Sequence, residues 1–196
     1  MTSETRRGVP VPWAALWSAE QEIDHDNHFL VWERGRLAYS DEIPGDRRLG
    51  VLWCRHRLGS HGEPLFGQLH TARQRLAMTR SLCQVCGGSA VNADGRISWL
   101  VPADSDMSWT MTPPTCDGCQ PEALRYCPHL TSKPPVRLTA AKSFPLGVLG
   151  DLYQVEGNRI TGVTPRSIVD FRDAPGMRRI LAKQLAVQLH DPQVEG

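Results

Sequence analysis

The stretch SLCQVCGGSA (81–90) places Cys83 and Cys86 two residues apart, with two glycines directly after them. Further along the chain, the stretch TCDGCQPEALRYCPHL (115–130) repeats the same C-x-x-C spacing. Two thiolates at this spacing, held in a tight turn, can point at one metal ion, and glycine permits the positive φ that such a turn often needs. The two stretches therefore predict a pair of metal-binding turns.

The second stretch supplies Cys116 and Cys119, so the two turns together offer four sulfurs in a tetrahedron. Structural zinc prefers this arrangement, and four thiolates leave no coordination position open for catalysis. We therefore predict one structural Zn²⁺ held by Cys83, Cys86, Cys116 and Cys119. A disulfide or an iron–sulfur cluster is the alternative, although disulfides are rare in the cytoplasm, where we expect this chain to reside.

Two further ligand candidates follow the second pair. Pro121 suits the first turn of a helix, so the chain should leave the second pair as a short helix. Cys127 then lies about two helical turns past Cys119, beyond reach of the ion, where a small buried hydrophobe is the usual role. His129 could replace a cysteine ligand or bond to one. The roles of Cys127 and His129 stay open, and Cys54 reads as a core residue.

Composition sets the class of protein. The chain has 196 residues, 40% hydrophobic and 22% charged, which is ordinary for a soluble globular protein. No run of 18 apolar residues predicts a membrane helix, and the first residues lack the apolar stretch of a secretory signal. We therefore expect a cytoplasmic location and no membrane partner. The net charge of +1 provides no global attraction to nucleic acid.

Local charge is less even than net charge. Between residues 47 and 82 the charged side chains are arginines except for Glu63, whereas between residues 84 and 118 they are aspartates except for Arg96. These segments are either complementary surfaces of one domain or a basic face that meets phosphate groups.

The basic face would lie on a predicted helix. The stretch EPLFGQLHTARQRLAMTRSL (63–82) predicts an amphipathic helix that runs into the first cysteine pair. Its apolar positions at helical spacing are Leu65, Leu69, Ala72 and Leu76. The predicted nucleic-acid contacts on its other side are Arg73, Arg75 and Arg80. In the alternative, these arginines pair inside the domain with Asp94, Asp104 or Asp106.

The rest of the chain predicts an α+β fold, in one compact domain. The expected parts are a flexible tail (1–12), an N-terminal β region (13–64), a treble-clef-like or zinc-ribbon module (65–132), and β-strands followed by a C-terminal helix (133–196). Within the N-terminal region, a turn at residues 33–35 should join two strands. Apolar residues spaced four apart predict that the stretch DAPGMRRILAKQLAVQLHD (173–191) is an amphipathic helix.

The order helix, C-x-x-C-Gly, strand, second C-x-x-C, helix resembles the treble-clef zinc fold over roughly residues 68–130. The run RQRLAMTRSLCQVCGG (73–88) is similar to the opening of cysteine-framed HNH endonucleases. Such a nuclease needs a histidine on the strand between the cysteine pairs, to activate water opposite a divalent ion. The stretch SWLVP (98–102) has none, so we predict no nuclease activity. The pattern of the whole chain also resembles small uncharacterised proteins of actinobacteria.

Three classes of function follow. The first is a non-enzymatic zinc-binding protein whose metal supports a surface for nucleic acid, bound weakly and without sequence preference, or for a protein partner. The second is a degenerate HNH-like or unfamiliar enzyme, in which His61, His70 or His129 supplies acid–base chemistry. The third is a structural or assembly component, associated with a phage. We favour the first class and expect no catalytic residues.

Overall fold

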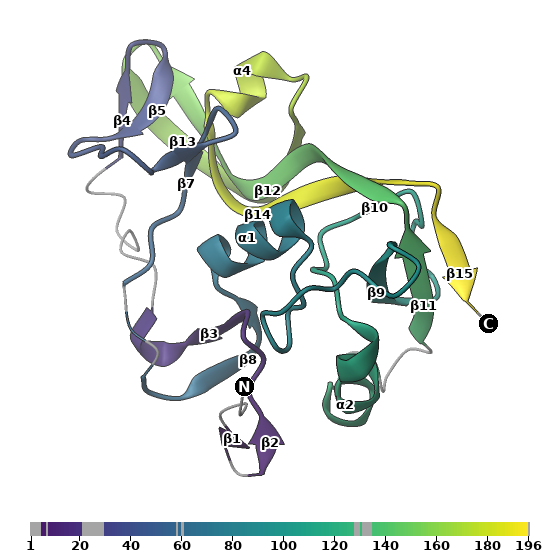
Figure 1. The fold of residues 1–196 in the computed structure, drawn as a ribbon. Helices are drawn as coiled ribbons and strands as arrows, with labels where there is room; N and C mark the ends of the chain where they lie inside the picture. Colours follow the sequence, from purple (N-terminus) through teal and green to yellow (C-terminus); the bar gives the residue numbers. More distant parts are fainter. Residues whose placement is uncertain are drawn as a thin grey trace.

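The computed structural model describes residues 5–6, 8–20, 30–57, 59, 61–127, 130 and 135–195. These residues form a mixed α+β fold, mostly strands with three short helices (Figure 1). The expected fold class is therefore confirmed at this level. Within the same residues, no helix combines the length and apolar character needed to cross a membrane.

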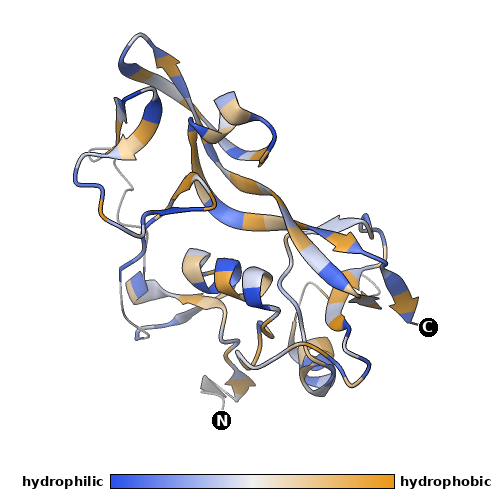
Figure 2. Ribbon diagram, turned by 45° about the horizontal axis from the view of Figure 1, so that its top comes forward, coloured by the Kyte–Doolittle hydropathy of each residue, from blue (hydrophilic) through white to orange (hydrophobic). Residues whose placement is uncertain are grey.

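The largest sheet has six strands. They are β6 (Arg47–Arg48), β7 (Val51–Trp53), β10 (Trp109–Thr110), β12 (Lys142–Glu156), β13 (Arg159–Asp170) and β14 (Ile180–His190). Their order is β13-β12-β14-β7-β6, and β10 also pairs with β14. Hydrophobic and hydrophilic residues alternate along the long strands (Figure 2), which is the period of two that a strand imposes. This sheet is the framework on which the cysteine-rich segment packs.

The predicted C-terminal helix is wrong, because residues 180–190 form strand β14. Only the short helix α4 (Ala174–Met177) precedes it. A spacing of four fits a strand as well as a helix, since it is twice the strand period of two. β14 pairs with β12 along one edge and with β7 and β10 along the other. These backbone hydrogen bonds and burial outweigh the helix propensity of its Leu, Ala, Lys and Gln residues.

Smaller sheets surround the large one. Their strands are β1 (Thr5–Arg6) with β2 (Val9–Pro10), β3 (Ala15–Trp17) with β8 (Pro64–Leu69), β4 (Leu30–Glu33) with β5 (Arg36–Tyr39), and β9 (Ile97–Pro102) with β11 (Pro135–Ala140) and β15 (Gln193–Glu195). The expected turn between β4 and β5 is confirmed, with Arg34 and Gly35 at positive φ. A 3-10 helix, η1 (Ser18–Glu20), follows β3.

The basic helix starts later than predicted. Helix α1 spans Thr71–Arg80, and Leu65 and Leu69 lie on β8 instead. His70 ends the strand and caps the helix, accepting a hydrogen bond from the Ala72 N–H at 3.1 Å. The buried side of α1 consists of Thr71, Gln74, Ala77 and Met78. The predicted apolar stripe is therefore wrong, and a polar side chain occupies the middle of the contact.

Gln74 joins α1 to the central strand. Its side chain is fully buried and acts towards Leu185 as a neighbouring strand would: Nε2 donates to the Leu185 carbonyl at 3.0 Å, and Oε1 accepts from the Leu185 N–H at 2.9 Å. Nε2 also donates to the Met111 carbonyl at 3.0 Å. One amide thus satisfies three backbone groups, two of which belong to the buried Leu185.

Gln74→Leu should lower the free energy of unfolding by about 2–4 kcal/mol, because buried backbone groups left without partners cost about 1–3 kcal/mol each. Gln68 is an exposed glutamine on β8, so Gln68→Leu is the matched control and should change stability by less than about 0.5 kcal/mol. Urea unfolding of both variants measures the difference. Equal stability of the two variants would contradict the role given to Gln74.

Candidate metal centre

The first cysteine turn begins where α1 ends. Ser81 adopts the left-handed conformation at φ 52°, which stops the helix and reverses the chain. The Cys83 N–H then donates to the Gly88 carbonyl at 2.7 Å, and the Gly87 N–H donates to the Cys83 carbonyl at 2.8 Å. Gly87 has a φ of 72° and lies against the Trp13 ring, so a side chain there would be strained and crowded.

The second cysteine turn opens helix α2 (Gln120–Tyr126). Residues 117–119 form a 3-10 turn, η2 (Asp117–Cys119), in which the Cys119 N–H donates to the Cys116 carbonyl at 2.9 Å. Proline follows in the first turn of α2, as the sequence predicted. Both sulfurs of this pair therefore lie at the start of a helix.

The four sulfurs meet. The Sγ atoms of Cys83, Cys86, Cys116 and Cys119 lie within 4.8 Å of one another. Those of Cys86 and Cys116 are 3.9 Å apart, close to the ~3.8 Å edge of a tetrahedron with zinc–sulfur bonds of about 2.3 Å. Donor type, donor number and spacing thus all suit zinc. The structure confirms the predicted cluster, which is consistent with a zinc-binding module.

Gln84 ties the two turns together, and sequence reasoning missed it. Its backbone N–H donates to the Pro114 carbonyl at 2.8 Å. Its side-chain Nε2 donates to the Pro113 carbonyl at 3.1 Å and to Thr115 Oγ1 at 3.0 Å. A glutamine between two cysteines carries no recognisable signal, because its partners lie about thirty residues away in the sequence.

Burial acts against the thiolate form of the cluster. Burial raises the pKa of the Cys83 thiol to about 11 and raises that of Cys119 still further. At Cys86 burial also acts upward, but the N–H of Gly88 and the neighbouring thiols lower the pKa below its ordinary value. A divalent ion among the sulfurs would supply the positive charge that stabilises all four thiolates.

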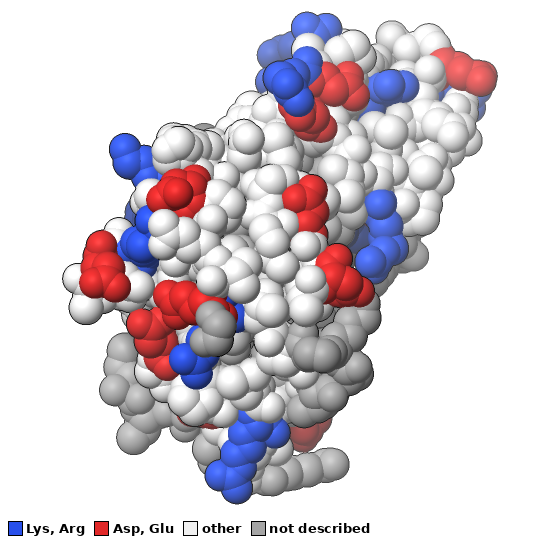
Figure 3. All heavy atoms as spheres, turned by 90° about the vertical axis from the view of Figure 1, so that its right-hand side faces the viewer, with Lys and Arg blue, Asp and Glu red and all other residues white. Residues whose placement is uncertain are grey.

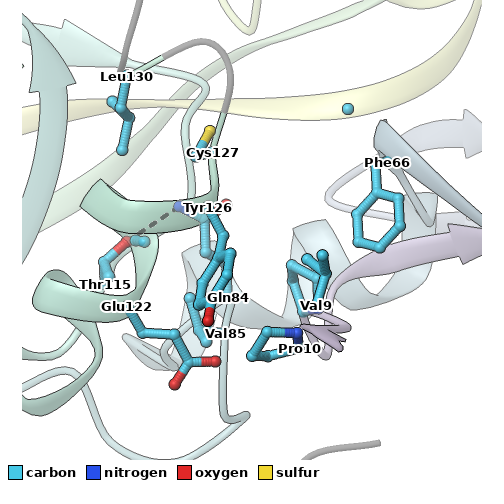
Figure 4. Close-up of a pocket in the computed structure, with 13 residues that line it drawn as sticks. Val9, Pro10, Phe66, Gln84, Val85, Thr115, Glu122, Tyr126, Cys127 and Leu130 are labelled. Carbon is cyan, nitrogen blue, oxygen red and sulfur yellow. Dashed lines mark hydrogen bonds between the residues drawn. The ribbon is translucent and has the colours of Figure 1, made fainter. Parts of the chain in front are cut away.

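Cys127 stands apart from the cluster. It lines an apolar pocket of about 170 Å³, in which Phe66 lies on one side and Tyr126 and Cys127 on the other (Figure 4). The pocket borders the first cysteine turn at Val85 and could hold one apolar side chain. His129, the other ligand candidate, lies outside the described residues.

Two of the predicted basic residues on α1 have partners within the protein. Arg73 forms an ion pair with the buried Glu20 at 2.5 Å, rather than with Asp94, Asp104 or Asp106. Arg75 stacks on the Trp53 ring, with 4.4 Å from its guanidinium carbon to the ring centroid.

Arg80 is exposed at the end of α1, whereas Arg73 and Arg75 are half-buried against other segments. The three arginines therefore do not form one exposed face. On the face that Figure 3 shows, basic and acidic side chains are interspersed. No patch of a single charge stands out in that view.

Neither described histidine candidate joins the sulfur cluster. His70 is buried, and burial together with the charges of Arg73 and His56 lowers its pKa to about 4. Its ring lies 4.6 Å from that of His56, which contacts the Thr71 hydroxyl and the Glu20 carbonyl, both at 2.8 Å. His61 is exposed. As expected, Cys54 is a core residue, and it packs in the cluster that includes Leu52.

Comparison of the chain with protein-family models, curated proteins and solved structures finds no match. The argument for function therefore rests on the sulfur cluster and the surfaces around it.

Proposed function

We propose that this chain is a non-enzymatic nucleic-acid-binding protein in which a structural zinc ion holds the binding surface together. The main observation behind this proposal is that four cysteine sulfurs from two separate turns of the chain lie within 4.8 Å of one another. Four thiolates fill the tetrahedral positions of zinc, and such sites are structural rather than catalytic.

The elements around the cluster support a treble-clef-like module. Helix α1, the first cysteine turn, strand β9, the second turn and helix α2 follow one another in that order. Cys83 belongs to the main hydrophobic core, together with Trp99 of β9 and Leu185 of β14. The ion would therefore fix α1 and α2 against the central sheet, and the arginines of α1 would be held in defined positions.

The test compares metal-loaded and chelated protein for binding to a fluorescein-labelled 20-nucleotide DNA of mixed sequence. We expect weak binding that loses affinity with rising salt, disappears on chelation and returns with zinc. Incubation with magnesium or manganese should leave plasmid DNA uncut. Cleavage that depends on the protein, or no binding at 20 mM salt by the zinc-loaded form, would overturn the proposed function.

A further inference from the structure

The guanidinium of Arg75 is a positive charge held against an apolar ring. Arg75 is half-buried and lies over the ring of Trp53, and Trp53 is almost fully buried. Burial lowers the pKa of Arg75, and the charge of Arg48 lowers it further. Both influences oppose the positive charge. Stacking on the indole leaves the N–H groups at the edge of the guanidinium plane available as donors.

Other half-buried arginines show what Arg75 lacks. The carboxylate pairs in the described part of the chain are Arg47 with Glu42, Arg55 with Asp46, Arg73 with Glu20, and Arg96 with Asp191. Arg179 donates to the Pro175 carbonyl. Among the residues that the structure describes, Arg75 is the half-buried arginine with neither kind of acceptor. An anionic acceptor from outside the chain would satisfy the hydrogen-bond donors of its guanidinium.

Arg48 is bonded to the same tryptophan through its backbone. The indole N–H of Trp53 donates to the Arg48 carbonyl at 2.9 Å, so the ring that carries Arg75 is bonded to the backbone of Arg48. Arg48 is exposed, precedes the turn between β6 and β7, and forms no ion pair within the described residues. Two arginines without a carboxylate partner in the described part of the chain are therefore linked to one tryptophan, Arg75 by its guanidinium and Arg48 by its carbonyl.

Positive charge continues beyond Arg48. An open cavity between the β4–β5 hairpin and β6 is lined by four arginines and two glutamates, namely Arg34, Arg36, Arg47, Arg48, Glu33 and Glu42. The glutamates offset only part of this charge, because Glu33 pairs with Arg34 and Glu42 is shared by Arg36 and Arg47. Arg48 thus belongs both to this cavity and to the tryptophan that carries Arg75. In Figure 1 the β4–β5 hairpin lies at the upper left and α1 near the centre.

We infer that Arg75 and Arg48 form a phosphate-binding site, and that its ligand is the backbone of a nucleic acid that continues over the arginines of the β4–β5 hairpin. This inference rests on the proposed function and names the contact surface for it. Arginines on three elements that outnumber the glutamates beside them match a chain of repeated phosphates better than a single anion, because successive phosphates can meet different cations. Contacts of this kind position the strand without reading its sequence.

The experiment uses the full zinc-loaded chain and fluorescence anisotropy with 20-nucleotide single-stranded DNA and the matching duplex. The test variant combines Arg48→Gln with Arg75→Met, since methionine keeps an apolar stem over the Trp53 ring. Arg75→Lys retains the charge but not the planar donor fork. The control is Arg137→Gln, which removes an exposed arginine from β11, on the other side of the molecule in Figure 1. Thermal unfolding establishes that each variant is folded.

We expect the double variant to bind at least roughly tenfold more weakly at low salt, and the slope of log affinity against log salt to fall by about two units. Arg75→Lys should retain the slope with lower affinity, and Arg137→Gln should match the wild type. A double variant that behaves like Arg137→Gln would overturn this site while leaving the proposed function intact. Absence of binding by the wild type would defeat the proposed function itself. Inorganic phosphate that displaces DNA at equal phosphate concentration would show a site for isolated anions and refute the extended surface.

Discussion

Cys83→Ser should remove the zinc and unfold the central part of the chain. Cys83 has no exposed surface and packs in the main core with Trp99 and Leu185, so loss of the ion reaches beyond the two turns. Structural zinc can supply on the order of 10 kcal/mol of folding free energy, which is comparable to the whole stability of an ordinary domain. The purified wild type should contain about one zinc ion per chain.

Cys127→Ser is the matched control for this experiment, because Cys127 is a partly buried thiol outside the sulfur cluster. It should retain stoichiometric zinc and unfold cooperatively near the wild-type temperature. Metal analysis and circular dichroism of both variants, with and without chelator, separate the outcomes. A metal-free wild type that stays fully folded with reduced cysteines would show that the cluster does not depend on a metal.

Glu20→Ala should have the second largest effect. Glu20 is 3% exposed and accepts hydrogen bonds from Arg73 at 2.7 and 2.5 Å and from the Trp17 N–H at 3.0 Å. Removing one partner of a buried ion pair leaves the other charge uncompensated, at a cost of about 3–5 kcal/mol. Asp170→Ala removes a surface pair with Arg172, which solvent screens, and should cost far less. Denaturant unfolding of both variants tests the contrast.

The same pair predicts a pH dependence. Burial raises the pKa of Glu20, but the hydrogen bonds from Arg73 and Trp17 outweigh it and leave the pKa below its ordinary value of 4.5. A carboxyl with a lowered pKa stabilises the fold above its unfolded-state pKa, and this contribution is lost as the pH falls through the folded-state pKa. The unfolding free energy of the wild type should therefore fall more steeply below about pH 4.5 than that of Glu20→Ala. Parallel curves would contradict this role of Glu20.

The sulfur cluster could be predicted from the sequence because its signal is local. Two cysteines two residues apart, followed by glycine, suffice to build each turn, and zinc chemistry requires the two turns to meet. The β4–β5 hairpin was equally local. Strand β14 was not, since leucines spaced four apart fit both periods and only the partners β12, β7 and β10 decide between them.

Partners distant in sequence account for the other differences. Arg73 and Arg75 look alike in the sequence, yet one meets Glu20 and the other meets Trp53, on segments that lie outside the helix. The sequence near each arginine does not indicate its partner. Spacing along α1 therefore predicted the presence of a basic helix but not which of its charges remain without a counter-charge.

The hydrogen bonds of Gln74 also bear on aggregation. Along one edge of β14, β7 pairs at Ala182 and β10 pairs at Val187, and Gln74 covers the Leu185 backbone between them. A strand edge with free N–H and C=O groups and apolar side chains is a template for pairing with another chain. Helix α1 thus shields a segment that would otherwise be open to strand pairing between molecules. The helix that leads into the first cysteine turn thus also opposes self-association of the protein through β14.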